Sequence, residues 1–156
     1  MKLLHLSFFF CCVISLQAQK TSVFAERTAE YERGLDLYDK GVYGAALTAF
    51  EKSSKIDAEL VEPKADLLSM KSQLMMSKSA VRIGKPDAEM VMLSFFRNNT
   101  PDALAYEAVM DLGNYYYAKK NYEEAISFYN MVDPATLSDD QKSEIKFKQG
   151  YAQFVK

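Results

Sequence analysis

The fold of this 156-residue chain is decided by residues 110–129, which read MDLGNYYYAKKNYEEAISFY. Residues 31–50, YERGLDLYDKGVYGAALTAF, carry the same pattern 79 residues earlier. Counted from Gly34 and from Gly113, both stretches have an apolar residue at +3, Tyr at +4 and +9, Ala at +12, an aliphatic residue at +13 and an aromatic ring at +16. Matches at this many positions indicate that the chain is built from a recurring unit.

The matched positions combine small residues with aromatic rings, as two packed helices require. The small residues are Gly34, Gly113, Ala46 and Ala125, and the rings are Tyr43, Phe50, Tyr116, Tyr122 and Tyr129. A small residue on each of two facing helices lets their backbones approach closely. We expect the rings at +16 to fill the groove toward the next unit and the tyrosines at +9 to pack under the turn between the helices.

This pattern resembles the tetratricopeptide repeat (TPR), a unit of about 34 residues that folds as two antiparallel helices. The resemblance covers residues of about 28–156 and implies an all-α fold. The expected architecture is an α-solenoid of antiparallel helix pairs, with seven helices in about three and a half repeats. The repeats would span about residues 27–60, 63–99 and 101–134, with a half repeat at 138–156.

Capping signals set the ends of the expected helices. Pro63 and Pro101 can each occupy the first turn of a helix, and Thr100 is a candidate N-cap. Ser138 and Gln141 form a capping box before the last helix. No segment shows a convincing alternating strand pattern. The predicted helices span about residues 22–40, 43–56, 63–83, 86–97, 101–119, 122–132 and 138–155.

The middle unit departs from the pattern, and two alignments of it stay open. If Gly84 is aligned with Gly41, Glu89 stands where the other units have their alanine. If Ala88 is aligned with Ala46 instead, the register shifts by one residue.

Residues 1–18 have the layout of a secretory signal peptide. Lys2 gives a positive start, residues 3–16 are mostly apolar, and Ala18 supplies a small residue at the expected cleavage point. The apolar run is shorter than the roughly 20 residues that a membrane-spanning helix needs. We therefore expect cleavage after Ala18, no stable membrane span afterwards, and a periplasmic, secreted or cell-envelope location.

Cleavage after Ala18 would remove the rarest side chains of the chain. His5 is the only histidine, and Cys11 and Cys12 are the only cysteines. Residues 19–156 therefore lack the usual zinc and copper ligands and the usual nucleophile–base pairs. No phosphate-binding Gly-rich loop or other catalytic signature is present. We expect no catalytic residues, no metal site and no cofactor, and a protein that is not an enzyme.

The charge balance also excludes a class of partner. The chain has 19 basic and 21 acidic residues, and its net charge of −2 becomes −3 when residues 1–18 are removed. Proteins that bind nucleic acids usually carry a basic excess. A nucleic-acid partner is therefore not expected.

In TPR proteins the first helices of the repeats line a concave groove that usually holds a peptide. Transferred by way of the motif glycines, the groove positions of the first and third units are Tyr31, Leu35, Tyr38, Met110, Asn114 and Tyr117. An asparagine directly after the motif glycine resembles the one with which chaperone-binding TPR domains hold a C-terminal carboxylate. The resemblance therefore implies a protein or peptide partner.

The middle unit contributes a row of basic residues to the expected groove. Lys71, Lys78 and Arg82 share one helical face. Such a row would suit a carboxylate or an acidic peptide, through charge-assisted hydrogen bonds. The alternative interpretation is an ordinary solvated basic face.

The last helix is apolar on two sides. Phe147, Tyr151 and Phe154 share one face, and Ile145 and Ala152 lie nearly opposite. A solenoid normally ends with a helix whose outer face is polar. Either the sequence is the N-terminal part of a longer repeat protein, which we favour, or the exposed face meets another subunit and the protein self-associates.

The sequence thus predicts an exported TPR scaffold that binds a protein or peptide partner, in envelope assembly or maintenance. The export signal, which ends in Leu16-Gln17-Ala18-Gln19, resembles those of envelope proteins of the Bacteroidota. The alternatives are an N-terminal repeat region of a longer protein and a self-associating structural module.

Overall fold

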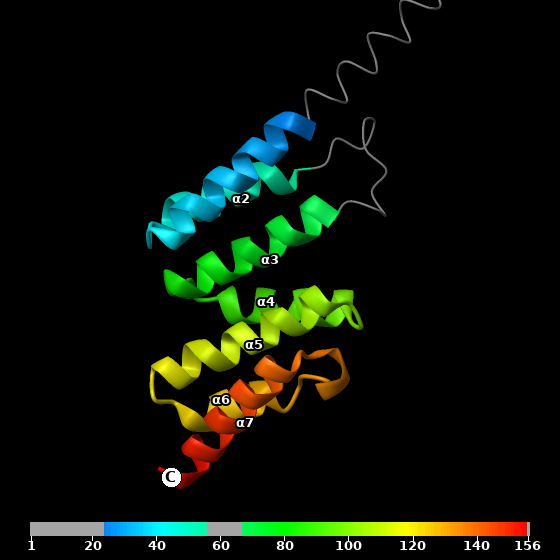
Figure 1. Ribbon diagram of the computed structural model, residues 1–156. Coiled ribbons are helices and arrows are strands. Elements are labelled where there is room, and N and C mark those ends of the chain that lie inside the picture. The colour runs from blue at the N-terminus through cyan, green and yellow to red at the C-terminus, as the bar shows by residue number, and fades with distance from the viewer. Residues whose placement is uncertain (1–23, 56–66, 156) are drawn as a thin grey trace, which may run out of the picture. The chain divides into compact units, whose positions relative to one another are not determined.

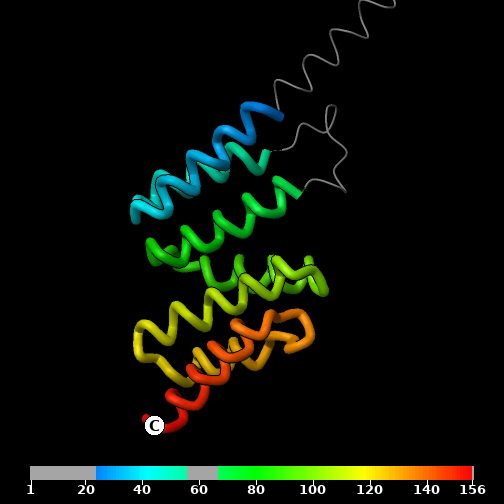
Figure 2. Tube along the Cα trace, in the orientation of Figure 1, coloured from blue at the N-terminus to red at the C-terminus, as the bar shows by residue number. Residues whose placement is uncertain are grey.

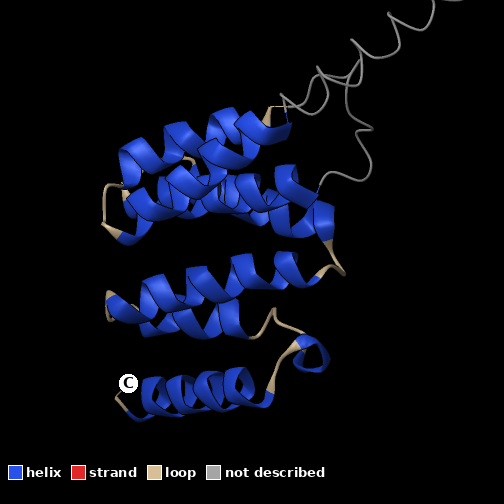
Figure 3. Ribbon diagram, turned by 45° about the horizontal axis from the view of Figure 1, so that its top comes forward, coloured by secondary structure: helices blue, strands red, loops and turns tan. Residues whose placement is uncertain are grey.

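The computed structural model describes residues 24–55 and 67–155, and their regular structure is entirely helical (Figure 3). The α-helices are one over residues 24–39, α2 (Tyr43–Ser54), α3 (Leu67–Arg82), α4 (Ala88–Asn99), α5 (Ala103–Ala118), α6 (Tyr122–Tyr129) and α7 (Asp139–Phe154). A short 3-10 helix, η2 (Pro134–Thr136), lies between α6 and α7. The all-α prediction is confirmed for these residues. The predicted signal peptide and the predicted helix start at Pro63 lie outside them.

The contacts divide the chain within α3, into residues 1–79 and residues 80–156. The first unit contains the helix at 24–39, α2 and most of α3 (Figure 1). The second contains the last turn of α3 and all of α4 to α7 (Figure 2). Each unit therefore holds one of the two stretches that share the sequence pattern.

In the first unit, the helix at 24–39 contacts α2 at Gly34. A Cβ atom added to Gly34 would lie 2.5 Å from a carbon of the Phe50 ring, so the site requires glycine. Phe50 is fully buried, and the Tyr31 ring packs against it with the centroids 5.7 Å apart. The Phe50 ring therefore packs within its own helix pair, on the backbone of Gly34, because glycine has no side chain there. We expected this ring to fill the groove toward the next unit.

The second unit repeats this contact at Gly113, where α5 meets α6. A Cβ atom added to Gly113 would lie 2.5 Å from the Tyr129 ring, and Tyr129 is buried. Tyr116 stacks on Phe128, with ring centroids 5.5 Å apart and planes inclined by 18°. Ala125 is fully buried, as Ala46 is in the first unit. Two stretches with the same pattern therefore form the same helix–helix contact.

Three helices end in the same kind of turn. The residues of positive φ in these turns are Gly41 (75°), Gly84 (71°) and Lys120 (61°). Each donates its N–H to the carbonyl three residues earlier, and the next residue donates to the carbonyl five residues earlier, at 2.9–3.1 Å. This Schellman arrangement satisfies the free carbonyls of a helix end. It costs a non-glycine residue such as Lys120 roughly 1–2 kcal/mol.

The burial pattern of α4 favours one of the two alignments of the middle unit. Ala88, Met92 and Phe95 are buried, at the same spacing as Ala125, Tyr129 and Val132 of the α6 segment. Glu89 is half-buried and accepts a hydrogen bond from the Tyr116 hydroxyl. This bond raises the pKa of Tyr116 to about 12, with smaller contributions from burial and nearby charge. Ala88, not Glu89, therefore occupies the position of the motif alanine.

The junction between α4 and α5 differs from the prediction by two residues. Asp102 is the N-cap of α5, and its carboxylate accepts the N–H of Leu104 at 2.8 Å. The Thr100 hydroxyl instead donates to the carbonyl of Phe96 at 2.7 Å and so closes the end of α4. The expected N-cap at Thr100 was wrong because its side chain bonds backwards along the chain.

Hydrogen bonds between serines join α2 and α3 within the first unit. The hydroxyls of Ser53 and Ser72 are 2.8 Å apart, and both residues are fully buried. Ser69 donates to the carbonyl of Ser54 at 3.0 Å, and Arg27 Nε donates to the carbonyl of Ser53 at 2.8 Å. Buried polar groups that are paired in this way avoid the penalty of desolvation.

The last helix, α7, begins at the predicted capping box. The Ser138 hydroxyl accepts from the Gln141 N–H, and the Gln141 side chain accepts from the Ser138 N–H. Ile145 and Ala152 are buried against the rest of the second unit. In the predicted half repeat at 138–156, Gly150 would be the motif glycine, but no atom from outside its own stretch of helix lies within 4 Å of a Cβ placed there.

Replacing glycine by alanine should have opposite effects on the two motif glycines of the second unit. Gly113→Ala should lower the free energy of unfolding by about 1–3 kcal/mol, because the new methyl group overlaps the buried Tyr129 ring. Gly150→Ala should raise it by up to about 1 kcal/mol, because alanine is the better helix former and the site is open. Urea unfolding followed by circular dichroism measures both values. Equal losses in the two variants would contradict the contact at Gly113.

Candidate functional site

The predicted groove residues of the first unit are half-buried, and the two tyrosines among them contact other rings. Tyr31 packs on Phe50, as described above, and Tyr38 meets Tyr43 edge-on with ring centroids 5.0 Å apart. Leu35 is also half-buried. Tyr43 therefore packs against the end of the preceding helix, as the sequence pattern predicts.

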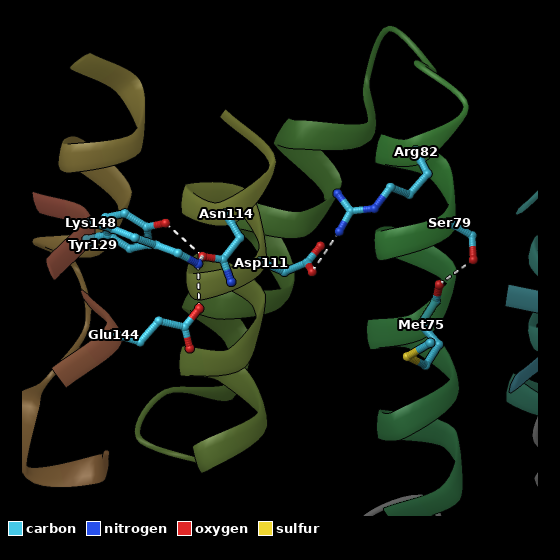
Figure 4. Close-up of polar contacts among 8 residues, drawn as sticks. All are labelled: Met75, Ser79, Arg82, Asp111, Asn114, Tyr129, Glu144 and Lys148. Carbon is cyan, nitrogen blue, oxygen red and sulfur yellow. Dashed lines mark hydrogen bonds and ion pairs between the residues drawn. The ribbon is translucent and has the colours of Figure 1, made fainter. Parts of the chain in front are cut away.

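In the second unit, the predicted groove residue Asn114 is the centre of a polar cluster (Figure 4). Its side-chain oxygen accepts hydrogen bonds from the Tyr129 hydroxyl and from Lys148 Nζ, both at 2.7 Å. Lys148 also forms an ion pair with Glu144, one turn earlier on α7. The cluster joins α5, α6 and α7, and its bonds do not use the NH2 group of Asn114.

The Tyr129 hydroxyl must keep its proton in order to donate to Asn114. Burial raises the pKa of Tyr129 well above its ordinary value, and the charges of Glu144 and Tyr117 raise it further. Its hydroxyl therefore stays protonated and donates to Asn114 at any physiological pH. The Asn114 oxygen has both of its lone pairs occupied, so a ligand would meet the amide NH2 group and not the carbonyl oxygen.

Three tyrosines form an aromatic cluster beside these polar groups. The ring centroids of Tyr117 and Tyr122 are 5.5 Å apart, and both rings lie close to Tyr151, at 6.1 Å and 6.0 Å. Lys148 Nζ is 5.7 Å from the centroid of the Tyr117 ring. Burial raises the pKa of Tyr122, and its tyrosine neighbours add to the shift. The cluster offers ring faces and edges with hydroxyl groups, a combination that suits peptide contacts.

The basic row predicted in the middle unit is divided between the two units of the fold. Lys71 and Lys78 are half-buried on the part of α3 that belongs to the first unit. Arg82 belongs to the second, where it pairs with Asp111 at 3.0 Å (Figure 4). The Arg82 guanidinium also lies 5.5 Å from the centroid of the Tyr115 ring. Arg82 is therefore engaged by an acid and a ring within the second unit.

The remaining predicted groove residue, Met110, is half-buried and packs against the core of the second unit. That core consists of Tyr106, Val109, Ala125, Tyr129, Val132 and Ile145. Met110 thus contributes to packing in this unit.

The most exposed aromatic side chains of the second unit lie on α7. Counted from the motif glycine, the expected groove positions are −3, +1 and +4, which in α7 are Phe147, Tyr151 and Phe154. Their side chains are 70%, 44% and 87% exposed. We call Phe147, Tyr151 and Phe154, with the open Gly150 between them, the α7 face. The sequence predicts that these rings share one side of a helix, but the predicted groove residues do not include them.

Other signs of a site are absent from the described part of the chain. Within residues 24–55 and 67–155, no group of three or more acidic, Cys or His residues is placed to hold a metal ion. No helix in these ranges is long and apolar enough to cross a membrane. Comparison of the chain with protein-family models, with curated proteins and with solved structures gives no match.

A double-mutant cycle on Asn114 and Tyr129 tests the polar cluster. Asn114→Ala should lower the free energy of unfolding by about 1–3 kcal/mol, because it leaves the mostly buried Tyr129 hydroxyl without its acceptor. Adding Tyr129→Phe to that variant should cost little more, since both partners of the bond are then gone. Chemical unfolding of the two single variants and the double variant measures the coupling. Losses that simply add would contradict the bond.

Proposed function

We propose that this chain is an exported helical-repeat scaffold of the TPR type. Its repeats would stack as an α-solenoid, and it would bind a protein or peptide partner with the first helices of those repeats. The repeated contact supports the assignment: Gly34 meets Phe50 and Gly113 meets Tyr129, each glycine sixteen residues before its ring. The shared Schellman turns support it as well.

The α7 face is the observation that carries the binding role. Phe147, Tyr151 and Phe154 occupy the positions that the TPR resemblance assigns to partner contact, and all three are exposed to solvent. Exposed aromatic residues gathered on one face, with charged residues beside them, are typical of protein interaction sites. The charged neighbours here are Glu144 and Lys148.

A non-catalytic role agrees with the side chains available. Residues 19–156 contain no His and no Cys, so nucleophile–base chemistry of the usual kinds has no residues to use. The polar groups beside the α7 face, Asn114 and Lys148, are donors that suit recognition of carbonyl or carboxylate groups.

Self-association through the α7 face is a second candidate function. The same three exposed rings favour it, since two copies could cover one another's apolar surface. In that case the partner bound at the α7 face would be a second copy of the chain.

Photocrosslinking in the living cell tests the binding role. A photoreactive residue at Tyr151 should yield adducts with one specific partner, because this position is exposed on the α7 face. The same residue at Met90 of α4, which is 66% exposed, should not. Phe147→Ser with Phe154→Ser should abolish the adduct and leave the melting temperature unchanged, since both side chains are in water. Adducts with a second copy would support self-association, and equal adducts at both positions would contradict both functions.

Export is a separate part of the proposal, with its own test. It rests on residues 1–18, whose order of positive, apolar and small residues suits secretion to the periplasm or cell envelope. Mass spectrometry of the protein purified from its native envelope should give Gln19 as the first residue. An intact N-terminus in the cytosolic fraction would contradict export.

A further inference from the structure

The second unit contains a cavity of about 280 Å³ between the end of α6, η2 and α7. Its base is apolar: Val132 and Ile145 are buried core residues, and Pro134 and Leu137 close the side formed by the connecting segment. Small-molecule sites usually measure about 300–1,000 Å³. The cavity lies just below the lower end of this range, so it is too small for a large cofactor but can take part of a peptide.

Two lysines give the cavity a positive rim. Lys142 and Lys146 line it from consecutive turns of α7, and none of its described lining residues is acidic. Lys142 also pairs with Asp139 at 3.3 Å, but Asp139 is fully exposed, and such surface pairs contribute little. An apolar base with two ammonium groups at the rim complements an apolar group that carries a carboxylate.

Two amide side chains complete the rim with groups that can pair with a peptide. Gln149 Nε2 donates to Asn130 Oδ1 at 2.9 Å, and both residues line the cavity. This bond leaves the NH2 group of Asn130 as a donor and the oxygen of Gln149 as an acceptor. A simple fatty acid has no N–H to offer that acceptor, whereas a peptide has one.

We propose that this cavity binds the C-terminal residue of a peptide, with an aliphatic side chain in the base and the free carboxylate at Lys142 and Lys146. An extended peptide points neighbouring side chains to opposite sides. An acidic residue next to the anchor would therefore point away from the cavity, which favours the carboxylate of the anchor residue itself. The N–H of that residue pairs with the Gln149 oxygen. This inference rests on the proposed function and names a partner class for it.

Fluorescence anisotropy with a labelled Gly-Ser-Gly-Leu peptide tests the proposal on the full chain. The peptide with a free C-terminus should bind at least tenfold more tightly than the same peptide with a C-terminal amide. Lys142→Met with Lys146→Met should weaken binding at least tenfold, because methionine keeps the helix propensity and removes both charges. Lys85→Met with Lys119→Met is the matched control, and it should leave binding unchanged.

A filled cavity provides a test that does not depend on charge. Leu137→Trp should block the peptide while circular dichroism shows an unchanged fold, since Leu137 is only half-buried. Equal binding of the free and amidated peptides would overturn the proposal, as would binding that survives Leu137→Trp. Octanoate that competes as well as the peptide would show a site for aliphatic acids, and so would overturn the peptide assignment.

Failure of this inference and failure of the proposed function give different results. If the cavity is not a site, neither labelled peptide binds, but the adduct at Tyr151 still forms. If the scaffold role is wrong, the adduct at Tyr151 is absent or unspecific, whether or not the labelled peptide binds at the cavity.

Discussion

The close contact of a glycine with an aromatic ring is the constraint on which both units of this protein depend. At Gly34 and Gly113 the space of a Cβ atom is taken by the rings of Phe50 and Tyr129. The second helix of each pair can therefore lie with an aromatic side chain directly on the backbone of the first. Ala46 and Ala125, both fully buried, keep the helices close one turn earlier. The Schellman turns at Gly41 and Lys120 then connect the helices and pair two carbonyl groups at the end of each first helix.

The same constraint explains why α7 is unusual within the second unit. Its motif glycine, Gly150, has no covering ring, and the residues around it, Phe147 and Phe154, are exposed. On the opposite side of α7, Ile145 and Ala152 are buried. One helix thus joins the core of its unit and presents an apolar face to solvent. This combination underlies the binding role that we propose.

Local signals in the sequence predicted where the helices lie. They could not predict which residues far apart in the sequence contact one another. The capping box at Ser138 depends on residues three positions apart, so their spacing alone identified it. The middle unit was ambiguous because Ala88 follows Gly84 by four residues, whereas Ala46 follows Gly41 by five. The bond from Lys148 to Asn114 joins residues 34 positions apart, and Arg82 and Asp111 are 29 apart. The spacing of residues along the chain does not reveal such pairs. The sequence therefore predicts Asn114 as a groove residue but does not predict that Tyr129 and Lys148 donate to its oxygen.

The ring current at the three motif glycines gives the most direct test of this account. In an NMR spectrum of the folded protein, the Hα protons of Gly34 and Gly113 should be displaced strongly from their random-coil shifts, because each glycine lies against a ring. The Hα protons of Gly150 should show ordinary helical shifts. Phe50→Leu and Tyr129→Leu should each restore the shift of the glycine that the ring covers and leave the other unchanged. Similar shifts at all three glycines, or shifts that persist without the rings, would contradict the contact from which the two units are built.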